Sequence, residues 1–396
     1  GLFCGLRLHR WPHHRLCWAP GVKQAIYIAS AIPFFMLAIG FEAWVAGRRR
    51  ISVYRFGDAI SDLSCGVTQQ CVLVVVGAAY TAGYAWVQER LGFVRWSPGS
   101  PWPWVIAFVG LDFAYYWWHR WSHEVNFLWA AHVVHHSSED YNLAVALRQA
   151  VATSPSFLLV VAMPMAVLGI SPAIYAASAA WNTLYQFWIH TRLVGTLGAL
   201  EEVINTPSLH RVHHAVNPRY LDRNYGGTLM IWDRMFGTFQ REEEPPVYGI
   251  TTPLRSYNPI WAQVHYWVQL FRLSKAAPRW ADKLRVWVAG PAWRPRGMPR
   301  AEAPDLPQYD PQPPMRVRWY VAAQFSTAIA ATFLLLLFQY SLPRPLLALC
   351  TGLVILSLLA WSGLTEGKRW GWPLEVGRMV VVLAAAAAVV GGALRA

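Results

Sequence analysis

Eight histidines lie in three short clusters and are the residues of this chain best suited to chemistry. Residues at i, i+3 and i+4 share one face of a helix, so each cluster can direct its imidazoles toward one point. Eight nitrogen donors exceed the three or four that one zinc ion usually takes from a protein. The spacing therefore predicts a pair of metal ions, the alternative being that unrelated histidines fall together by chance. The clusters are His119-x3-His123, His132-x2-His135-His136 and His210-x2-His213-His214.

The remaining five histidines differ in their prospects as ligands. His190 ends an expected helix at residues 173–189 and reaches the side that carries the clusters. We therefore expect it to be a ninth ligand rather than a helix cap. His265 stands alone on an amphipathic stretch and is not expected to bind metal. Three others imitate a cluster, but Pro12 would interrupt the helix that must align them; they are His9, His13 and His14.

Carboxylates near the clusters could support such a centre, because imidazole ligands bring no negative charge and are usually oriented by neighbouring acids. Asp112 precedes His119 by seven residues on the same helix face. We expect it to accept a hydrogen bond from a ligand imidazole, with a wet vestibule or a backbone contact as the alternative. Glu124, Glu139 and Asp140 flank the second cluster, where each could also be solvated. Asp112, Glu139 and Asp140 are thus candidate catalytic residues.

The elements that position these residues are apolar helices. The chain is 55% hydrophobic with 23 tryptophans, and about 20 apolar residues suffice for a helix to cross a bilayer. An open strand cannot satisfy its backbone in lipid, so the spans must be helical. We predict an all-α, polytopic membrane bundle with a histidine-rich cytoplasmic cap and further C-terminal transmembrane helices. The expected spans are residues 23–46, 67–87, 102–118, 154–168, 173–189, 319–340, 345–364 and 374–393.

The distribution of arginine predicts which membrane face carries the clusters. The loop after the first span holds more arginines than the loop after the second, so the positive-inside rule places the first loop in the cytoplasm. The third span then ends at the cytoplasmic face beside His119, and the hairpin of the fourth and fifth spans returns there at His190. We expect an active site on the cytoplasmic face, although basic residues before the first span argue for the opposite orientation.

Four segments are expected along the chain. Residues 1–22 form an N-terminal tail without a signal-peptide pattern, and 23–290 form the membrane-embedded metal domain. Residues 291–317 form a linker rich in proline. Residues 318–396 carry the last three spans, which contain no histidine and are not expected to touch the metals. Tryptophans and basic residues mix between 261 and 288, which predicts two amphipathic helices broken at Pro278, interfacial or buried in the cap.

Charge and cysteine content exclude other classes of protein. The net charge is +13, but the basic residues flank apolar spans, where anionic lipid and topology account for them. We expect no nucleic-acid partner. The five cysteines are scattered and form no C-x-x-C pair, so they indicate neither a disulfide framework nor a thiolate metal site.

Around the clusters, the chain resembles the fatty acid hydroxylase and sterol desaturase superfamily, whose members carry H-x3-H, H-x2-H-H and a later H-x2-H-H on membrane helices. Within that superfamily the connecting segments are similar to the alkylglycerol monooxygenase branch. The likeness extends over residues 25–290. It includes WWHR at 117–120, HEVN at 123–126, HHSSEDYN at 135–142, NTPS at 205–208 and DRNYGG at 222–227.

This resemblance implies a di-iron centre that activates O2 and hydroxylates a carbon atom of a lipid. Zinc could replace iron in purified protein, because affinity alone does not select iron. In the alkylglycerol monooxygenase branch the oxidised carbon bears the ether oxygen, so the product collapses to an aldehyde and glycerol, and tetrahydrobiopterin supplies electrons. Glu124 matches a glutamate that follows the first cluster in that branch and is the candidate pterin contact.

Other functions stay open at this point. The same kind of centre serves lipid and sterol desaturases and hydroxylases of acyl chains or ornithine-type lipids, with an electron-donor protein in place of the pterin. A metal transporter is a non-enzymatic alternative. Transporters place their ligands near the bilayer midplane, however, whereas these clusters lie at the ends of expected spans.

Overall fold

All regular secondary structure in the described part of the chain is helical, as the sequence predicts. The computed structural model describes residues 20–298 and 306–393, where strand-like pairing is limited to two isolated bridges. The longer helices are α1 (Pro20–Arg49), α2 (Phe56–Leu91), α3 (Trp102–Glu124), α4 (Asn126–His136), α7 (Pro172–Trp188), α10 (Pro259–Ala276), α11 (Trp280–Val288), α12 (Met315–Phe338), α13 (Arg344–Thr365) and α14 (Gly371–Ala393). The short ones are η2 (Val145–Leu147), α5 (Thr153–Phe157), η3 (Leu158–Ala162), α6 (Met163–Val167), η4 (Gly198–Glu202), α8 (Pro207–His213) and α9 (Ile231–Met235).

Four of the described helices are long and apolar enough to cross a membrane, and the chain is a membrane protein. They are Ala29–Arg49 of α1, then α2, α12 and α13. Three of the other expected spans are helical, but each is too short or too polar to count among these four helices. The apolar segment Thr153–Val167 is short and includes the π-helical turn η3, α7 has 17 residues, and α3 carries the polar side chains of Asp112, His119 and His123.

Helix α2 is longer than a bilayer is thick. Its 36 residues extend about 54 Å at 1.5 Å per residue, against about 30 Å of hydrocarbon. One end must therefore project into a polar layer. The first turns of α2 carry Asp58, Ser61 and Asp62, all buried, so the projecting end packs against protein rather than water.

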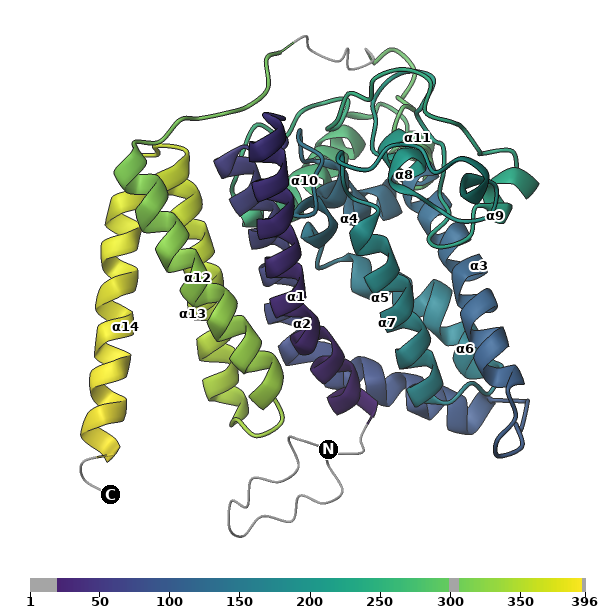
Figure 1. Ribbon diagram of the computed structural model, residues 1–396, viewed down its shortest axis with the longest axis horizontal. Helices are drawn as coiled ribbons and strands as arrows, with labels where there is room; N and C mark the ends of the chain where they lie inside the picture. Colours follow the sequence, from purple (N-terminus) through teal and green to yellow (C-terminus); the bar gives the residue numbers. More distant parts are fainter. Residues whose placement is uncertain (1–19, 299–305, 394–396) are drawn as a thin grey trace.

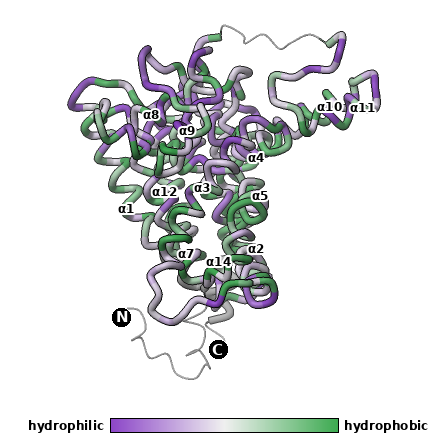
Figure 2. The backbone as a smooth tube through the Cα atoms, turned by 90° about the vertical axis from the view of Figure 1, so that its right-hand side faces the viewer, coloured by the Kyte–Doolittle hydropathy of each residue, from purple (hydrophilic) through white to green (hydrophobic). Residues whose placement is uncertain are grey.

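The upright helices and the polar layer occupy different ends of the molecule. Figure 1 shows α1, α2, α3 and α7 side by side, with α4, α8, α9, α10 and α11 gathered at one end. In Figure 2 hydrophilic chain concentrates at that same end, and the opposite part of the bundle is mostly hydrophobic. The helices thus hold a cap at one end of an apolar bundle.

Two of the C-terminal helices, α12 and α13, pack on the first two helices, and α14 packs on α13. Buried residues of α12 and α13, including Val321, Phe325 and Leu358, form one core with Val67 and Cys71 of α2. Figure 1 accordingly shows α12 and α13 on the side of α1 and α2 away from α3. The C-terminal helices are therefore built into the bundle rather than attached only by the linker.

Helices α10 and α11 confirm the predicted pair with a break at Pro278. One side is buried, because Tyr266, Leu270 and Val286 pack on residues of α4. The other side is exposed and apolar: Trp280 is 80% exposed and Leu284 is 72% exposed. The pair thus has both a face in the cap and a face free to meet lipid.

Candidate metal centre

Four helices bring the histidines together. His119 and His123 come from α3, and Val125 follows in an extended conformation with φ of −124°, which bends the chain before α4 begins. Helix α8 begins with the Thr206 hydroxyl accepting a hydrogen bond from the backbone of Leu209, and Pro207 occupies its first position. The remaining imidazoles lie on α4, at the end of α7 and on α8 or just after it.

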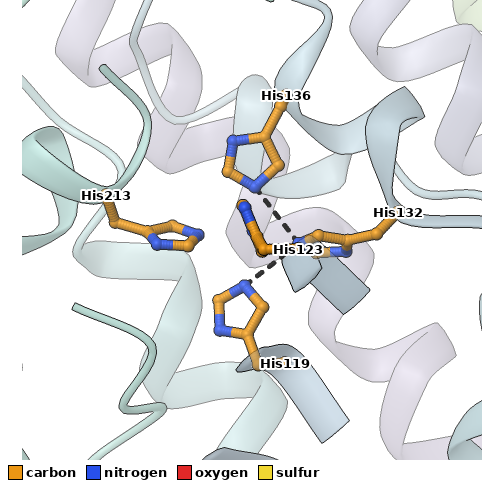
Figure 3. A group of neighbouring side chains, drawn as sticks. All are labelled: His119, His123, His132, His136 and His213. Carbon is orange, nitrogen blue, oxygen red and sulfur yellow. Dashed lines mark hydrogen bonds between the residues drawn. The ribbon is translucent and has the colours of Figure 1, made fainter. Parts of the chain in front are cut away.

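The nine imidazoles form two groups, each with nitrogen atoms within 4.8 Å of one another. All nine side chains are buried, although His123 as a whole residue is of intermediate exposure. Figure 3 shows the first group, with the five rings directed toward a common space. The first group is His119, His123, His132, His136 and His213; the second is His135, His190, His210 and His214.

Each His-His pair is divided between the two groups. Neighbouring residues on a helix point about 100° apart, so His135 and His136 cannot face the same ion. His136 belongs to the first group and His135 to the second, and His213 and His214 are divided in the same way. Between the groups, the rings of His136 and His214 stack at 4.3 Å. The two sites are therefore adjacent and share two helices.

Backbone carbonyls fix the orientation of four imidazoles. The Nδ1 atoms of His119 and His213 donate to the carbonyls of Tyr225 and Arg223, at 2.8 and 2.9 Å. In the second group His135 donates to Arg148, at 3.0 Å, and His190 donates to Gln186, at 2.7 Å. An imidazole that donates through Nδ1 carries its lone pair on Nε2. Each of the four rings thus presents a metal-binding atom to its group.

The contact between His135 and His190 fits a bound cation. Their Nε2 atoms lie 3.3 Å apart, yet both rings use Nδ1 as the donor, so two lone pairs face each other. Protonation of one ring would turn the contact into a hydrogen bond, but burial lowers the pKa of His135 to about 4, so this ring is neutral at physiological pH. Two nitrogens bound at about 2.1 Å to one ion would lie about 3.0–3.4 Å apart. The observed spacing matches this arrangement.

Unpartnered nitrogens point to the same conclusion. Buried Nε2 atoms of His123, His213 and His214, and Nδ1 of His210, have no hydrogen-bond partner. A buried polar atom without a partner is costly. Burial also lowers the pKa of His213 to about 3, so it is neutral at physiological pH. The donor set can therefore hold metal ions, one in each group.

Asp112 does not contact a histidine, so the expected hydrogen bond to a ligand imidazole is wrong. Its carboxylate accepts from the backbone of Thr228 and Leu229, at 2.8 and 3.1 Å, and from the indole of Trp232, at 2.9 Å. Asn182 is a fourth donor, at 3.3 Å. Asp112 is thus occupied by the loop before α9. Backbone carbonyl groups of that loop, rather than side-chain carboxylates, accept hydrogen bonds from the imidazoles of His119 and His213.

Residues 222–225 form the turn that supplies two of those carbonyls. Asp222 and Asn224 have φ of 59° and 56°, a region that these two residue types tolerate better than most. The side chain of Asn224 donates to the carbonyls of Leu209 and Gln240, at 2.9 and 2.7 Å. Asp233 accepts from the backbone of Tyr225, at 2.7 Å. Burial raises the pKa of Asp233 to about 6.

Sequence reasoning missed Asn224 and Asp233 as positioning residues. The signal was present in the DRNYGG segment, which combines two residues suited to positive φ with two glycines. Their roles depend on contacts with α8 and α9 that spacing alone does not reveal.

Glu139 and Asp140 also lie away from the imidazoles, contrary to the expected support of the second cluster. The chain turns after α4 and brings both carboxylates to Arg55, at 3.7 and 3.0 Å. Glu139 further accepts from the backbone of Tyr309, at 2.7 Å. Burial and the nearby Asp58 raise the pKa of Asp140 to about 6. These acids join the loop after α4 to α2 and the linker.

Arg148 and Asp62 form a buried ion pair that the sequence did not indicate. Their side chains are 1% and 0% exposed, and the charged atoms lie 3.0 Å apart. The guanidinium also donates to the carbonyl of Val134 on α4, at 2.6 Å, while the carbonyl of Arg148 receives His135. The pair therefore links α2 to the helix that carries the second cluster.

Glu124 and His265 lie outside the two histidine groups. Glu124 directly follows His123, is 40% exposed and pairs with Arg120 at 2.9 Å. His265 donates to the carbonyl of Ala262 and belongs to neither group. His9, His13 and His14 lie outside the described residues.

A cavity of about 440 Å³ borders the second group. Its walls are mainly apolar side chains of α1, α2, α5, α7 and α12, and it reaches His132, His135 and His190. An apolar cavity with a few convergent polar groups is typical of a ligand site. The described chain thus offers a hydrocarbon ligand a route to the imidazoles.

Comparison with known proteins gives consistent likenesses. The fatty acid hydroxylase family model matches residues 104–238, which include all nine grouped histidines. An alkylglycerol monooxygenase of Xenopus tropicalis is 38% identical over 90% of this chain and 81% of its own length. The Homo sapiens alkylglycerol monooxygenase is 42% identical over 69% of this chain and 61% of its own length. The ornithine lipid hydroxylase OlsE of Rhizobium tropici is 30% identical over 44% of this chain and 54% of its own length. No solved structure matches the chain.

Proposed function

Because this chain belongs to the fatty acid hydroxylase family, together with the alkylglycerol monooxygenases, we propose that it oxidises the ether-bearing carbon of an alkylglycerol lipid. Its broader class is a lipid-hydroxylating monooxygenase, an oxidoreductase. The observation that carries the proposal is the apolar cavity that ends on His132, His135 and His190. A lipid chain held there would bring its polar end to the second histidine group.

The reaction balances with one external two-electron donor. One atom of O2 is inserted into a C–H bond beside the ether oxygen, and the other leaves as water after taking two electrons and two protons. The hydroxylated carbon then carries both a hydroxyl and an ether oxygen. This hemiacetal breaks its C–O bond to glycerol, giving an aldehyde and free glycerol.

The metal pair would supply the activation of O2, and the chain's own residues would hold and orient it. We assign iron to both histidine groups, with zinc as a replacement in purified protein. The carbonyls of Gln186 and Arg148 orient two imidazoles beside the cavity. The buried apolar walls exclude water, which keeps the oxidising chemistry on the lipid carbon.

Tetrahydrobiopterin is the proposed electron donor, with Glu124 as its contact. Glu124 is partly exposed, directly follows His123 and pairs with Arg120, so a polar ring could reach it from the surface of the cap. An electron-donor protein is the alternative.

If Glu124 contacts the pterin, Glu124→Gln should retain the metals and raise the pterin concentration needed for half-maximal turnover. The exposed Glu243 offers a control, since Glu243→Gln should change neither.

We place the protein across the membrane in several passes, with the metal groups on the cytoplasmic face. Arg48 and Arg49 end α1, and Arg50 follows them, at the end of the bundle where the cap lies (Figure 1), as the positive-inside rule favours for a cytoplasmic end. Protease or thiol-labelling accessibility in sealed vesicles tests this orientation.

Hydroxylation of another lipid is the second candidate, favoured by the likeness to the ornithine lipid hydroxylase. Purified protein supplied with alkylglycerol, O2 and tetrahydrobiopterin should release fatty aldehyde. In a parallel assay with ornithine lipid, hydroxylated product in the absence of any aldehyde from alkylglycerol would overturn the ether-cleavage proposal and leave the monooxygenase class intact. A desaturated lipid as the product would overturn both.

The ligand assignment has its own test. Metal analysis of active protein should approach two equivalents, and His213→Ala should abolish activity because it removes a metal bond. His265→Ala is the matched control and should remain near normal. One equivalent or less in fully active protein would contradict the paired centre, as would full activity in His213→Ala.

A further inference from the structure

We propose that α12 and the turn after it form the far wall of the substrate-chain cavity and so limit the length of the hydrocarbon chain. This inference rests on the proposed function. Ile329, Thr332 and Leu336 of α12, with Gln339 and Tyr340 after it, line the same cavity that reaches the histidines. The C-terminal helices carry no histidine, yet they contribute to the site.

The cavity extends along most of the membrane-spanning part of α2. Its lining on this helix begins at Leu63 and continues to Tyr84, about 32 Å at 1.5 Å per residue, which is close to the hydrocarbon thickness of a bilayer. Gln69 marks the level of the second histidine group, because it donates to the carbonyl of Ala150, two residues after Arg148. From Gln69 to Tyr84 the distance along α2 is about 22 Å.

The end away from the histidines is lined by polar side chains. Tyr84 donates to the carbonyl of Ile170 in the turn between α6 and α7, at 3.0 Å. Gln339 and Tyr340 line the cavity where α12 ends. An alkyl chain that enters with its polar end at the histidines would therefore direct its methyl end toward these residues.

The wall is rigid because α12 belongs to the continuous core. Leu336 is 4% exposed, and its neighbour one turn earlier, Thr332, donates to the carbonyl of Ala328. Helix α14 is also joined to α12. Arg378 of α14 pairs with Glu375 and donates to Gln324 of α12, at 3.2 Å. A close-packed wall of this kind resists expansion, so a longer chain would meet a steric limit.

This wall lies outside the segment that defines the family. The family model ends at residue 238, whereas α12 begins at Met315. The histidines and the chain-length limit therefore come from different parts of the sequence. Chain-length preference could change in this protein without any change at the metal ligands.

The test replaces Leu336, which lines the cavity, and uses an outward residue of the same helix as control. Leu336→Trp should lower kcat/KM for a long-chain alkylglycerol at least tenfold while leaving a short-chain one nearly unchanged. Leu336→Ala should shift the preference toward longer chains. Leu334 is 51% exposed, so Leu334→Trp should keep the original profile. Metal content and thermal unfolding identify any variant that fails to fold.

A binding measurement separates this inference from the proposed reaction. Thermal stabilisation by alkylglycerols of graded chain length should show the same shift in Leu336→Trp without requiring turnover. If no aldehyde forms but the stabilisation profile shifts, ether cleavage fails and the wall stands. If aldehyde forms and neither Leu336 variant alters either profile, α12 does not limit the chain.

Discussion

The Arg148 ion pair offers the most direct test of how the cap is held on the bundle. Arg148→Met would leave the Asp62 carboxylate buried without its cation. It would also remove the hydrogen bonds that the guanidinium donates to the Ser61 hydroxyl and the Val134 carbonyl. Breaking a fully buried pair by removing one partner typically costs about 3–5 kcal/mol. We expect a loss of stability of that size, visible as a fall of several degrees in the unfolding temperature.

The control is an exposed pair of the same chemistry. Arg219 and Glu243 form an ion pair in which the side chains are 45% and 48% exposed. Solvent-exposed pairs contribute about 0–1 kcal/mol, so Arg219→Met should hardly change unfolding. The double variant Asp62→Leu with Arg148→Met should recover much of the lost stability, because an apolar pair needs no compensation for desolvated charge.

The assay is thermal unfolding of the purified protein in one detergent at one scan rate, since membrane proteins often unfold irreversibly. Metal retention against a graded chelator gives a second readout. The Arg148 guanidinium holds α4 beside His135, so the second histidine group should release its metal first. Equal effects of Arg148→Met and Arg219→Met would refute the reasoning, as would a double variant no better than the single one.

Three further predictions concern the acids and the exposed face of α11. The pKa of Asp140 is raised to about 6, so its contribution to the free energy of unfolding is full below about pH 4 and is lost as the pH rises through 6. Asp140→Asn should flatten that part of the pH dependence of thermal unfolding, and an unchanged slope would count against it. Asp112→Asn should loosen residues 228–232 and speed proteolysis there, because a donor amide replaces one acceptor oxygen; unaltered cleavage would contradict this. Trp280 should be quenched by lipids brominated near the headgroup, measured as the difference from Trp280→Phe, and no difference would place α11 away from lipid.

Local patterns in the sequence predicted much of the fold. Two apolar runs joined by a short turn located the hairpin that α5, η3 and α6 form with α7. The predicted C-terminal spans differ from α12 and α13 by only a few residues at their ends. Helical spacing within each cluster indicated convergent imidazoles. These features depend on neighbours along the chain, and a single sequence records them directly.

Features that join distant segments were less accessible. Three of the four hydrogen-bond donors to Asp112 lie more than a hundred residues away in the sequence, at Thr228, Leu229 and Trp232. Arg148 and Asp62 are separated by 86 residues. The imidazole acceptors are carbonyls, which every residue possesses, so side-chain identity could not reveal them. The contribution of α12 to the cavity depends on its packing against α1 and α2, which the absence of histidine in this helix does not reveal.

The carbonyl acceptors have a consequence for mutational tolerance. Replacing the side chain of Arg223 or Gln186 leaves its carbonyl in place, so ring orientation should survive most point substitutions at these positions. Insertions or deletions between α8 and α9 would instead shift the carbonyls relative to the rings. Redesign of the metal preference should therefore begin with the length and path of these loops.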